Sequence, residues 1–395
     1  MPRPSDFRGG VKVADELYFD YAATAPVRPE VRERMAEWLD IYGNPSSLHR
    51  MGMRAERALR HARDQVMQSL GARDGRLVFT GGGTEANNLA IYGVARAYAN
   101  RGRHLVTTAI EHPAVREAMG DLEREGFDVS YVRPDHRGDV SAEDVLRHVR
   151  DDTVLVSVMH VNNETGAVLP VEQIADKLKA HPKVVFHVDG TQALGKIPVS
   201  LARTRIHLYA ASGHKLGALK GVGALYVHAS LRLKPHVVGG GQEFGLRSGT
   251  ENVLGALSFG EAALHAVRDM ENDVDAERKR DRLARGLEEL GYVLMNPKHH
   301  SPYILCAALP GARGEILVHA FEEKGLYVSA GSACSSGKHG REPSHVLTAM
   351  GVKPELALAA IRFSWHPGTR MSEIEHALEV VRERTAWIKQ ALGIR

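Results

Sequence analysis

Short apolar runs alternate with segments of helical periodicity between about residues 77 and 228. The segment that follows 128–133 opens on Ser141, a good N-cap, with Asp144 three residues later. Strand–helix alternation predicts an α/β fold, with a mostly parallel sheet sandwiched by helices. We expect strands at seven apolar runs, which are 77–80, 104–109, 128–133, 153–161, 183–189, 206–212 and 223–228.

The pattern changes after about residue 251, where the chain becomes long and helical as far as residue 290. The middle of this stretch is highly charged, which predicts a solvated helix face. Shorter strand and helix patterns follow, and a terminal helix is expected from about 371 to 392. We therefore predict a large domain over 19–262 and a smaller α+β domain formed by 1–18 together with 263–395.

Length and composition fit this picture, because 395 residues suggest two domains and 43% hydrophobic with 25% charged residues is ordinary for a globular protein. The net charge of +3 is too small to favour nucleic acid or an anionic membrane as a partner. No apolar stretch approaches the length of a membrane span, and no histidine or cysteine spacing predicts a metal site. Two cysteines, Cys306 and Cys334, give no disulfide framework, so we expect a cytoplasmic protein.

Asp189 and Lys215 are the two residues with the clearest chemistry. Asp189 ends an apolar run, and Lys215 lies in a glycine-bounded loop, ASGHKLG (211–217). Pyridoxal phosphate needs both residue types, since a lysine amine holds its aldehyde and a carboxylate keeps its ring nitrogen protonated. A lysine in such a loop is usually only solvated, so the hypothesis depends on the other motifs.

Two segments have the character of anion sites. TGGGTEANNLAIYG (80–93) runs from a strand directly into a helix, which places Gly83 and Thr84 where a phosphate would meet free backbone amides. RSGTEN (247–252) places Thr250 at another expected helix start. A tight structural turn and an ordinary N-cap are the respective alternatives.

Several polar residues follow expected strands, where ligands of parallel sheets bind. His112 precedes a proline that opens a helix, and it could stack on a flat ring or shuttle protons; a capping or core histidine is the alternative. Asn163 and Gln192 could contact a ring hydroxyl, although turn asparagines often serve backbone geometry only. Ser212 and His214 flank the lysine loop and could reach a phosphate.

The C-terminal third contributes a thiol and an arginine. Cys334 lies among glycines and serines, which favours an exposed thiol that can act as a nucleophile, whereas Cys306 in an apolar run is expected to be a small buried hydrophobe. Arg362 lies inside an apolar strand pattern and therefore needs an anionic partner. A substrate carboxylate and a structural salt bridge are both open.

Together these motifs resemble the cysteine desulfurases of the NifS/IscS type, in the class V aminotransferase group of pyridoxal phosphate enzymes with fold type I. The resemblance spans about residues 17–380. It rests on motifs in a fixed order, namely YFDYAATAPV (18–27), GNPSSLH (43–49), TGGGTEANNLA (80–90), EHPAV (111–115), MHVNNETGAV (159–168), HVDGTQALGK (187–196), SGHKLG (212–217), GGGQEFGLRSGT (239–250), GSACSSG (331–337), EPSHVL (342–347) and IRFSW (361–365).

The resemblance implies a role for each candidate around the cofactor. Lys215 would form the Schiff base, Asp189 would pair with the ring nitrogen, and His112 would stack on the ring. Contacts to the ring oxygen and to the phosphate would come from the remaining residues, which are Asn163, Gln192, Gly83, Thr84, Ser212, His214 and, from the second subunit of a homodimer, Thr250.

It also implies the substrate and the reaction. Asn44 and Arg362 would hold the carboxylate of L-cysteine, which becomes L-alanine. Cys334, on a mobile loop at about 329–343, would receive the sulfur as a persulfide. The acceptor would be a partner protein such as an iron–sulfur scaffold or a tRNA-thiolation relay. A selenocysteine lyase, another class V aminotransferase and a non-catalytic binding module are the alternatives.

Overall fold

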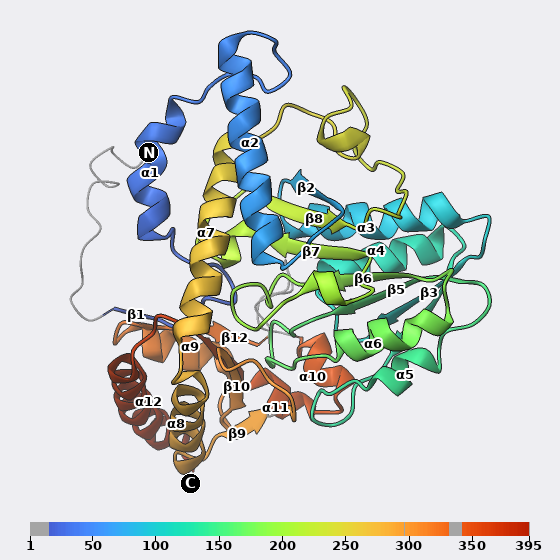
Figure 1. Ribbon diagram of the computed structural model, residues 1–395. Coiled ribbons are helices and arrows are strands. Elements are labelled where there is room, and N and C mark those ends of the chain that lie inside the picture. The colour runs from blue at the N-terminus through green and yellow to red at the C-terminus, as the bar shows by residue number, and fades with distance from the viewer. Residues whose placement is uncertain (1–15, 296, 332–341, 395) are drawn as a thin grey trace.

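The computed structural model describes residues 16–295, 297–331 and 342–394, and its largest sheet has seven strands (Figure 1). The strand order is β2-β8-β7-β6-β5-β3-β4, and β8 runs antiparallel to both its neighbours. The mostly parallel α/β sheet that the sequence predicts is confirmed. The strands are β2 (Arg76–Thr80), β3 (His104–Thr108), β4 (Asp128–Val132), β5 (Thr153–Met159), β6 (Val185–Asp189), β7 (Leu208–Ser212) and β8 (Gly223–Val227).

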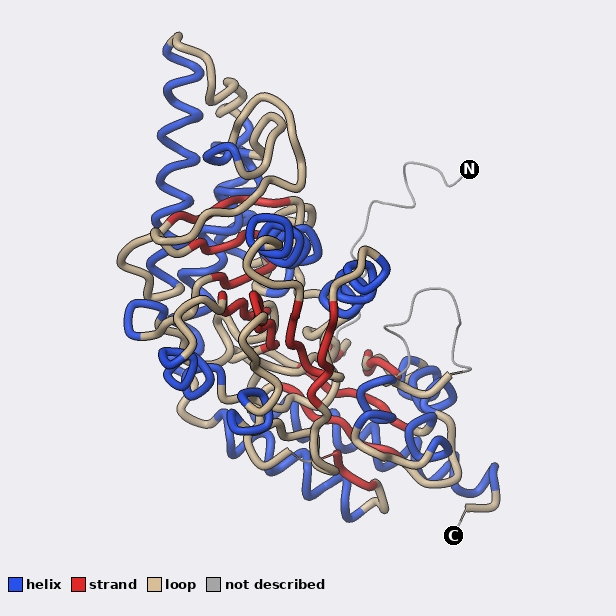
Figure 2. Tube along the Cα trace, turned by 90° about the vertical axis from the view of Figure 1, so that its right-hand side faces the viewer, coloured by secondary structure: helices blue, strands red, loops and turns tan. Residues whose placement is uncertain are grey.

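Helices cover both faces of this sheet because alternate residues of its strands point to opposite sides. In β7, Leu208 and Ala210 belong to the core under α3 and α4, whereas Tyr209 and Ala211 belong to the core under α2 and α7. Figure 2 shows strands in the interior with helices around them. The covering helices are α1 (Pro29–Leu39), α2 (Arg50–Ser69), α3 (Gly83–Tyr98), α4 (Pro113–Arg124), α5 (Ala142–Leu146), α6 (Val171–Lys177) and α7 (Val253–Asn272).

Local sequence explains where several of these helices begin. Ser141 and Asp144 form the predicted capping box of α5, with the Asp144 amide 3.1 Å from Ser141 Oγ. Proline occupies the first turn of α1 and of α4, where its missing N–H costs no helical hydrogen bond.

A second group of elements follows α7. Four strands form an antiparallel sheet in the order β12-β13-β10-β9, and β1 pairs in parallel with β11. The predicted boundary at residue 262 falls inside α7, so the division into domains stays a prediction. The elements of this group are β1 (Leu17–Tyr18), α8 (Ala276–Glu289), β9 (Val293–Met295), β10 (Ile304–Ala308), α9 (Gly314–Glu322), β11 (Leu326–Tyr327), β12 (Ser329–Ala330), α10 (His345–Ala349), α11 (Pro354–Leu358), β13 (Ala360–Ser364) and α12 (Met371–Leu392).

The charged stretch before residue 290 is not simply a solvated helix face, and that expectation is wrong for two cations. Lys279 and Arg280 are only 4% and 2% exposed. Lys279 Nζ lies 2.6 Å from Asp273 Oδ1 and 2.9 Å from the Thr369 carbonyl. The helix is interrupted after Asn272, and α8 packs against α12, which buries this side of α8. Among the described residues, no helix has the length and apolar character needed to cross a membrane.

Candidate active site

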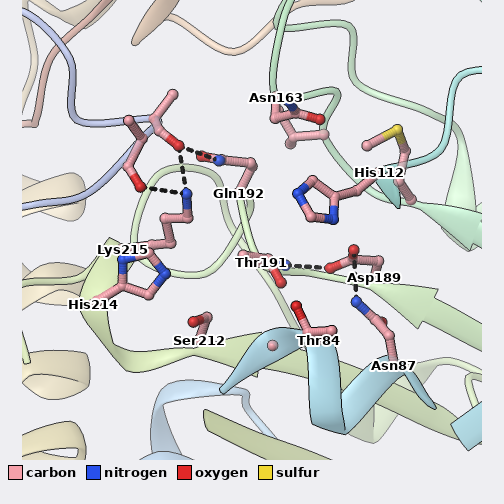
Figure 3. Close-up of a pocket in the computed structure, with 15 residues that line it drawn as sticks. Thr84, Asn87, His112, Asn163, Asp189, Thr191, Gln192, Ser212, His214 and Lys215 are labelled. Carbon is pink, nitrogen blue, oxygen red and sulfur yellow. Dashed lines mark hydrogen bonds between the residues drawn. The ribbon is translucent and has the colours of Figure 1, made fainter. Parts of the chain in front are cut away.

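A cavity of about 320 Å³ opens at the carboxyl ends of the parallel strands, as the sequence predicts for a ligand site (Figure 3). The last residues of β5, β6 and β7 all line it, and α3 begins at its edge. The cavity brings together nine of the predicted site residues, which are Gly83, Thr84, His112, Asn163, Asp189, Gln192, Ser212, His214 and Lys215.

Lys215 ends a short 3₁₀ helix (Gly213–Lys215) directly after β7, and its side chain crosses the cavity. Its Nζ donates to the Ala22 carbonyl at 2.6 Å and to the Ala23 carbonyl at 2.7 Å. Gln192 Nε2 donates to the same Ala22 carbonyl at 2.8 Å. The segment after β1 therefore forms one wall of the cavity, a contact that the motif YFDYAATAPV (18–27) did not predict.

Asp189 is 4% exposed, and both its carboxylate oxygens accept hydrogen bonds. Asn87 Nδ2 lies 2.9 Å from Oδ2, and the Thr191 amide lies 3.0 Å from Oδ1. These two bonds fix the plane of the carboxylate at the cavity wall. Sequence reasoning missed Asn87, although it is four residues after Gly83 and so lies on the same face of α3, which is a usable signal.

His112 lies on the opposite side of the cavity from Lys215 (Figure 3). Its Nδ1 accepts the Ala114 amide at 3.1 Å, so the ring caps α4 while it also lines the cavity. Burial lowers the pKa of His112, and Lys215 lowers it further, against the opposing effect of Asp189. The ring is therefore neutral near pH 7, and its proton is on Nε2 because Nδ1 is an acceptor. The capping alternative is therefore confirmed, and the role of His112 against a cofactor ring stays a prediction.

An anion cradle lies at the lower end of the cavity in Figure 3. A Cβ on Gly83 would lie 3.1 Å from Thr191 Oγ1 and 3.2 Å from Ser212 Cβ, so only glycine leaves the start of α3 open. Burial lowers the pKa of His214 to about 4, with Lys215 adding to the effect, so this ring is a neutral donor. A helix N-terminus with hydroxyl and imidazole donors suits a phosphate group.

The cavity also holds buried polar atoms with unused hydrogen-bonding capacity. Asn87 Oδ1 and Thr191 Oγ1 have no hydrogen-bond partner within the described part of the chain. Buried polar atoms are normally paired, so a polar ligand is expected to complete them. Together with Lys215, Asp189 and the anion cradle, this donor and acceptor set fits pyridoxal phosphate.

Arg362 lies in the middle of β13 and is 3% exposed. Its Nη2 is 2.8 Å from Asp20 Oδ1, and its Nη1 donates to the Asn163 carbonyl at 2.8 Å. The structural salt bridge that the sequence left open is therefore present. Because Asn163 lines the cavity, the guanidinium is also directly connected to the site.

Three candidates lie elsewhere. Asn44 and Thr250 are exposed and outside the cavity, and Cys334 lies outside the described residues. The N-cap of α7 is Asn252, whose Oδ1 accepts the Gly255 amide at 2.9 Å, so the N-cap interpretation of Thr250 is wrong. Cys306 is fully buried, as predicted, and burial followed by Glu164 raises its pKa to about 12.

The fold and the site together place the protein in a class of α/β enzymes. In this class a lysine, a carboxylate and a helix N-terminus surround one cavity. The profile of the Aminotransferase class-V family matches residues 17–376. The cysteine desulfurase IscS of Pectobacterium carotovorum is 43% identical over 376 residues, which cover 93% of this chain and 92% of that protein.

Two solved structures are similar as well. A NifS-like protein superposes with a TM-score of 0.87 at 36% identity, covering 94% of this chain and all of that one. SspA in complex with cysteine has a TM-score of 0.77 at 34% identity, covering 89% of this chain and 99% of that one. The chain belongs to the class V aminotransferase family, whose members depend on pyridoxal phosphate, and within that family to the cysteine desulfurases.

Proposed function

We propose that the protein is a pyridoxal phosphate-dependent cysteine desulfurase that converts L-cysteine to L-alanine and takes up the sulfur as a persulfide on Cys334. It works as a homodimer in the cytoplasm and passes the sulfur to an acceptor protein, such as an iron–sulfur scaffold or a tRNA-thiolation relay. The observation that carries this proposal is the meeting of Lys215, Asp189 and His112 in one cavity of a chain that is 43% identical to a cysteine desulfurase.

The polar residues that line the cavity would share the contacts to the cofactor. Lys215 would hold the aldehyde carbon, and Asp189 would pair with the ring nitrogen, with its plane fixed by Asn87. The start of α3, Ser212 and His214 would hold the phosphate. When bound, the cofactor supplies an electron sink that makes the substrate Cα–H acidic.

Proton transfer is the task of this chain's own side chains. Lys215 Nζ would take the Cα proton as a neutral amine, after the substrate amine has replaced it on the aldehyde carbon. In this structure the same nitrogen donates to the Ala22 and Ala23 carbonyls. His112, neutral and protonated on Nε2, can donate to a developing negative charge and recover the proton later. Both side chains are only half-buried, and they line the cavity in which the transfers would take place.

Sulfur transfer needs a nucleophile. The Cys334 thiolate attacks the substrate sulfur, the bond from sulfur to substrate Cβ breaks, and the electron pair stays on Cβ, which is then protonated. The products are L-alanine and a Cys334 persulfide, so sulfur is transferred with no external oxidant. Arg362 would hold the substrate carboxylate by sharing or exchanging its contact with Asp20, and the complex of the relative SspA with cysteine supports this substrate.

Exposed apolar side chains support the homodimer. Leu39, Tyr42 and Leu48 are 61%, 78% and 95% exposed. Leu39 ends α1, and the other two lie in the loop that leads into α2 at one tip of the molecule (Figure 1). A partner subunit would cover such a patch. Asn44 lies in the same loop, and Thr250 is also exposed, so both would serve a pocket that is completed across the dimer.

The test measures alanine release from L-cysteine with a reductant present, in the native protein, in Cys334→Ser and in the matched control Cys306→Ala. We expect alanine from the native chain and the control, a loss on the order of 100-fold or more in Cys334→Ser, and the same visible absorbance in all three. Normal alanine release and sulfur loading in Cys334→Ser would remove Cys334 from the mechanism.

Other outcomes point to the alternatives. If none of the three proteins released alanine and the native protein consumed a keto acid, the chain would be another class V aminotransferase. Much faster turnover of selenocysteine than of cysteine would make it a selenocysteine lyase. A protein that stays colourless with added pyridoxal phosphate would favour a non-catalytic binding module.

A further inference from the structure

Lys196 is a buried lysine next to the active site for which the reaction as described has no use. It ends the turn after β6 and is 5% exposed. Its Nζ lies 2.7 Å from Oε1 of Gln192, one turn earlier in the chain. A separate cavity of about 260 Å³ is lined by Lys196 and by Lys215, so both lysine side chains border one space.

The Gln192 amide has two hydrogen-bond partners, one that can only donate and one that can only accept. A lysine ammonium can only donate, so it must face the amide oxygen, and the Ala22 carbonyl can only accept, so it must face the amide nitrogen. Both contacts favour the same orientation of the Gln192 side-chain amide, which could otherwise flip and exchange its oxygen and nitrogen. Within the described residues, the amide nitrogen donates to Ala22 alone, so its second N–H is left for a bound group.

We propose that Lys196 is a positioning residue that fixes the Gln192 amide as a hydrogen-bond donor toward the ring oxygen of the bound cofactor. This inference rests on the proposed function, because it concerns pyridoxal phosphate in the same cavity. When Lys196 is protonated, its contact is charge-assisted and therefore the stronger of the two that hold the amide. Without it, the buried amide oxygen loses its partner, and the amide is free to turn.

The surroundings of Lys196 argue against a role in stability. Burial, followed by the charges of Lys215 and Arg362, lowers its pKa to about 7. Lys196 forms none of the ion pairs found among the described residues. A buried cation beside two other cations costs stability, so an apolar side chain of similar length would suit folding better.

The test compares Lys196→Met and Lys196→Arg, each made in the native chain and in Gln192→Ala. The readouts are the dissociation constant of pyridoxal phosphate from the resting protein, the position of its visible absorbance band, and the urea midpoint of the cofactor-free chain. None of these requires turnover. Lys196→Arg keeps a donor-only cation, and the adjoining cavity has room for its longer side chain.

We expect Lys196→Met to weaken cofactor binding by about tenfold and to shift the band, because one hydrogen bond to a charged donor is lost. Its urea midpoint should not fall. Lys196→Arg should recover most of both changes. In the Gln192→Ala background, Lys196→Met should change nothing further, since it acts through that amide.

Three results would overturn the inference. These are a native dissociation constant and spectrum in Lys196→Met, an equally large effect in the Gln192→Ala background, and a loss of stability large enough to account for weaker binding. Failure of the native chain to bind pyridoxal phosphate would instead overturn the proposed function, and the two failures are therefore distinguishable.

Discussion

Two walls of the same cavity are built in different ways. The sheet-edge wall consists of the ends of β5, β6 and β7 together with the start of α3, and each of its side chains follows closely after its own strand. The N-terminal wall is the segment 20–24, which lies opposite. It provides two backbone carbonyls to Lys215, one to Gln192 and a carboxylate to Arg362.

The two walls differ in how far apart along the chain their contacting residues lie. On the sheet-edge wall, the order of motifs along the chain already implies proximity, because carboxyl ends of neighbouring parallel strands share one edge. On the N-terminal wall, the contact from Lys215 to Ala22 spans 193 residues, and that from Arg362 to Asp20 spans 342. The sheet-edge wall carries the residues proposed to bind the cofactor, and the N-terminal wall holds Lys215, Gln192 and Arg362 in place by hydrogen bonds.

The largest effect should come from the residue that both walls share. Lys215→Ala should reduce alanine release by on the order of 10⁴-fold or more and should abolish the absorbance of lysine-bound cofactor, because no other amine takes its position. Absorbance spectra and alanine assays check this. Lys220→Ala, an exposed lysine five residues later, is the control and should behave as the native chain does. A persisting lysine-bound spectrum would refute the assignment.

A second change addresses the N-terminal wall. Arg362→Lys should raise the KM for cysteine by roughly 100-fold with a smaller change in kcat, because a single ammonium cannot hold both Asp20 and a carboxylate in a planar fork. Steady-state kinetics measure it, with Arg60→Lys, an exposed pair on α2, as the control. An unchanged KM would make Arg362 purely structural.

A third change concerns a residue of the sheet-edge wall that would act on the cofactor through Asp189. Asn87→Ala should lower kcat/KM by about tenfold, since Asp189 loses the hydrogen bond that fixes its plane but keeps its charge. Stopped assays of alanine release at several cysteine concentrations give the ratio. Asn88→Ala, on the neighbouring position of α3, removes a bond to the Ala114 carbonyl instead and should cost less. Equal losses in both variants would contradict the orienting role.

The smallest effect should be a change in how the urea midpoint depends on pH. Glu111, beside His112, is fully buried, and burial raises its pKa to about 8 against the hydrogen bonds from Thr108 and Met159. A raised folded-state pKa contributes stability that is present below the usual pKa near 4.5 and is lost as pH rises through about 8. Glu111→Gln should therefore flatten the fall in urea midpoint between about pH 4.5 and pH 8. An unchanged slope would contradict burial as its cause.

Much of the fold could be predicted from sequence because its information is local. Strand runs, the capping box at Ser141 and the proline at the start of α4 each depend on neighbours in the chain. The errors came where burial depends on distant packing. Lys279 and Arg280 look solvated in a charged stretch, and only the packing of α8 against α12 shows that they are inside.

From the sequence by itself, the positions of the strands along the chain could be predicted, and Lys215, Asp189 and Gly83 could be proposed as cofactor-binding residues, because these inferences depend on residue type and on position after a strand. Only the tertiary structure decided that Asp20 pairs with Arg362, that Ala22 accepts from Lys215, and that Lys196 faces Gln192. The first two contacts join segments far apart in the chain. The third contact is local along the chain. It orients the Gln192 amide only together with the Ala22 carbonyl, which the fold brings to the other side of that amide.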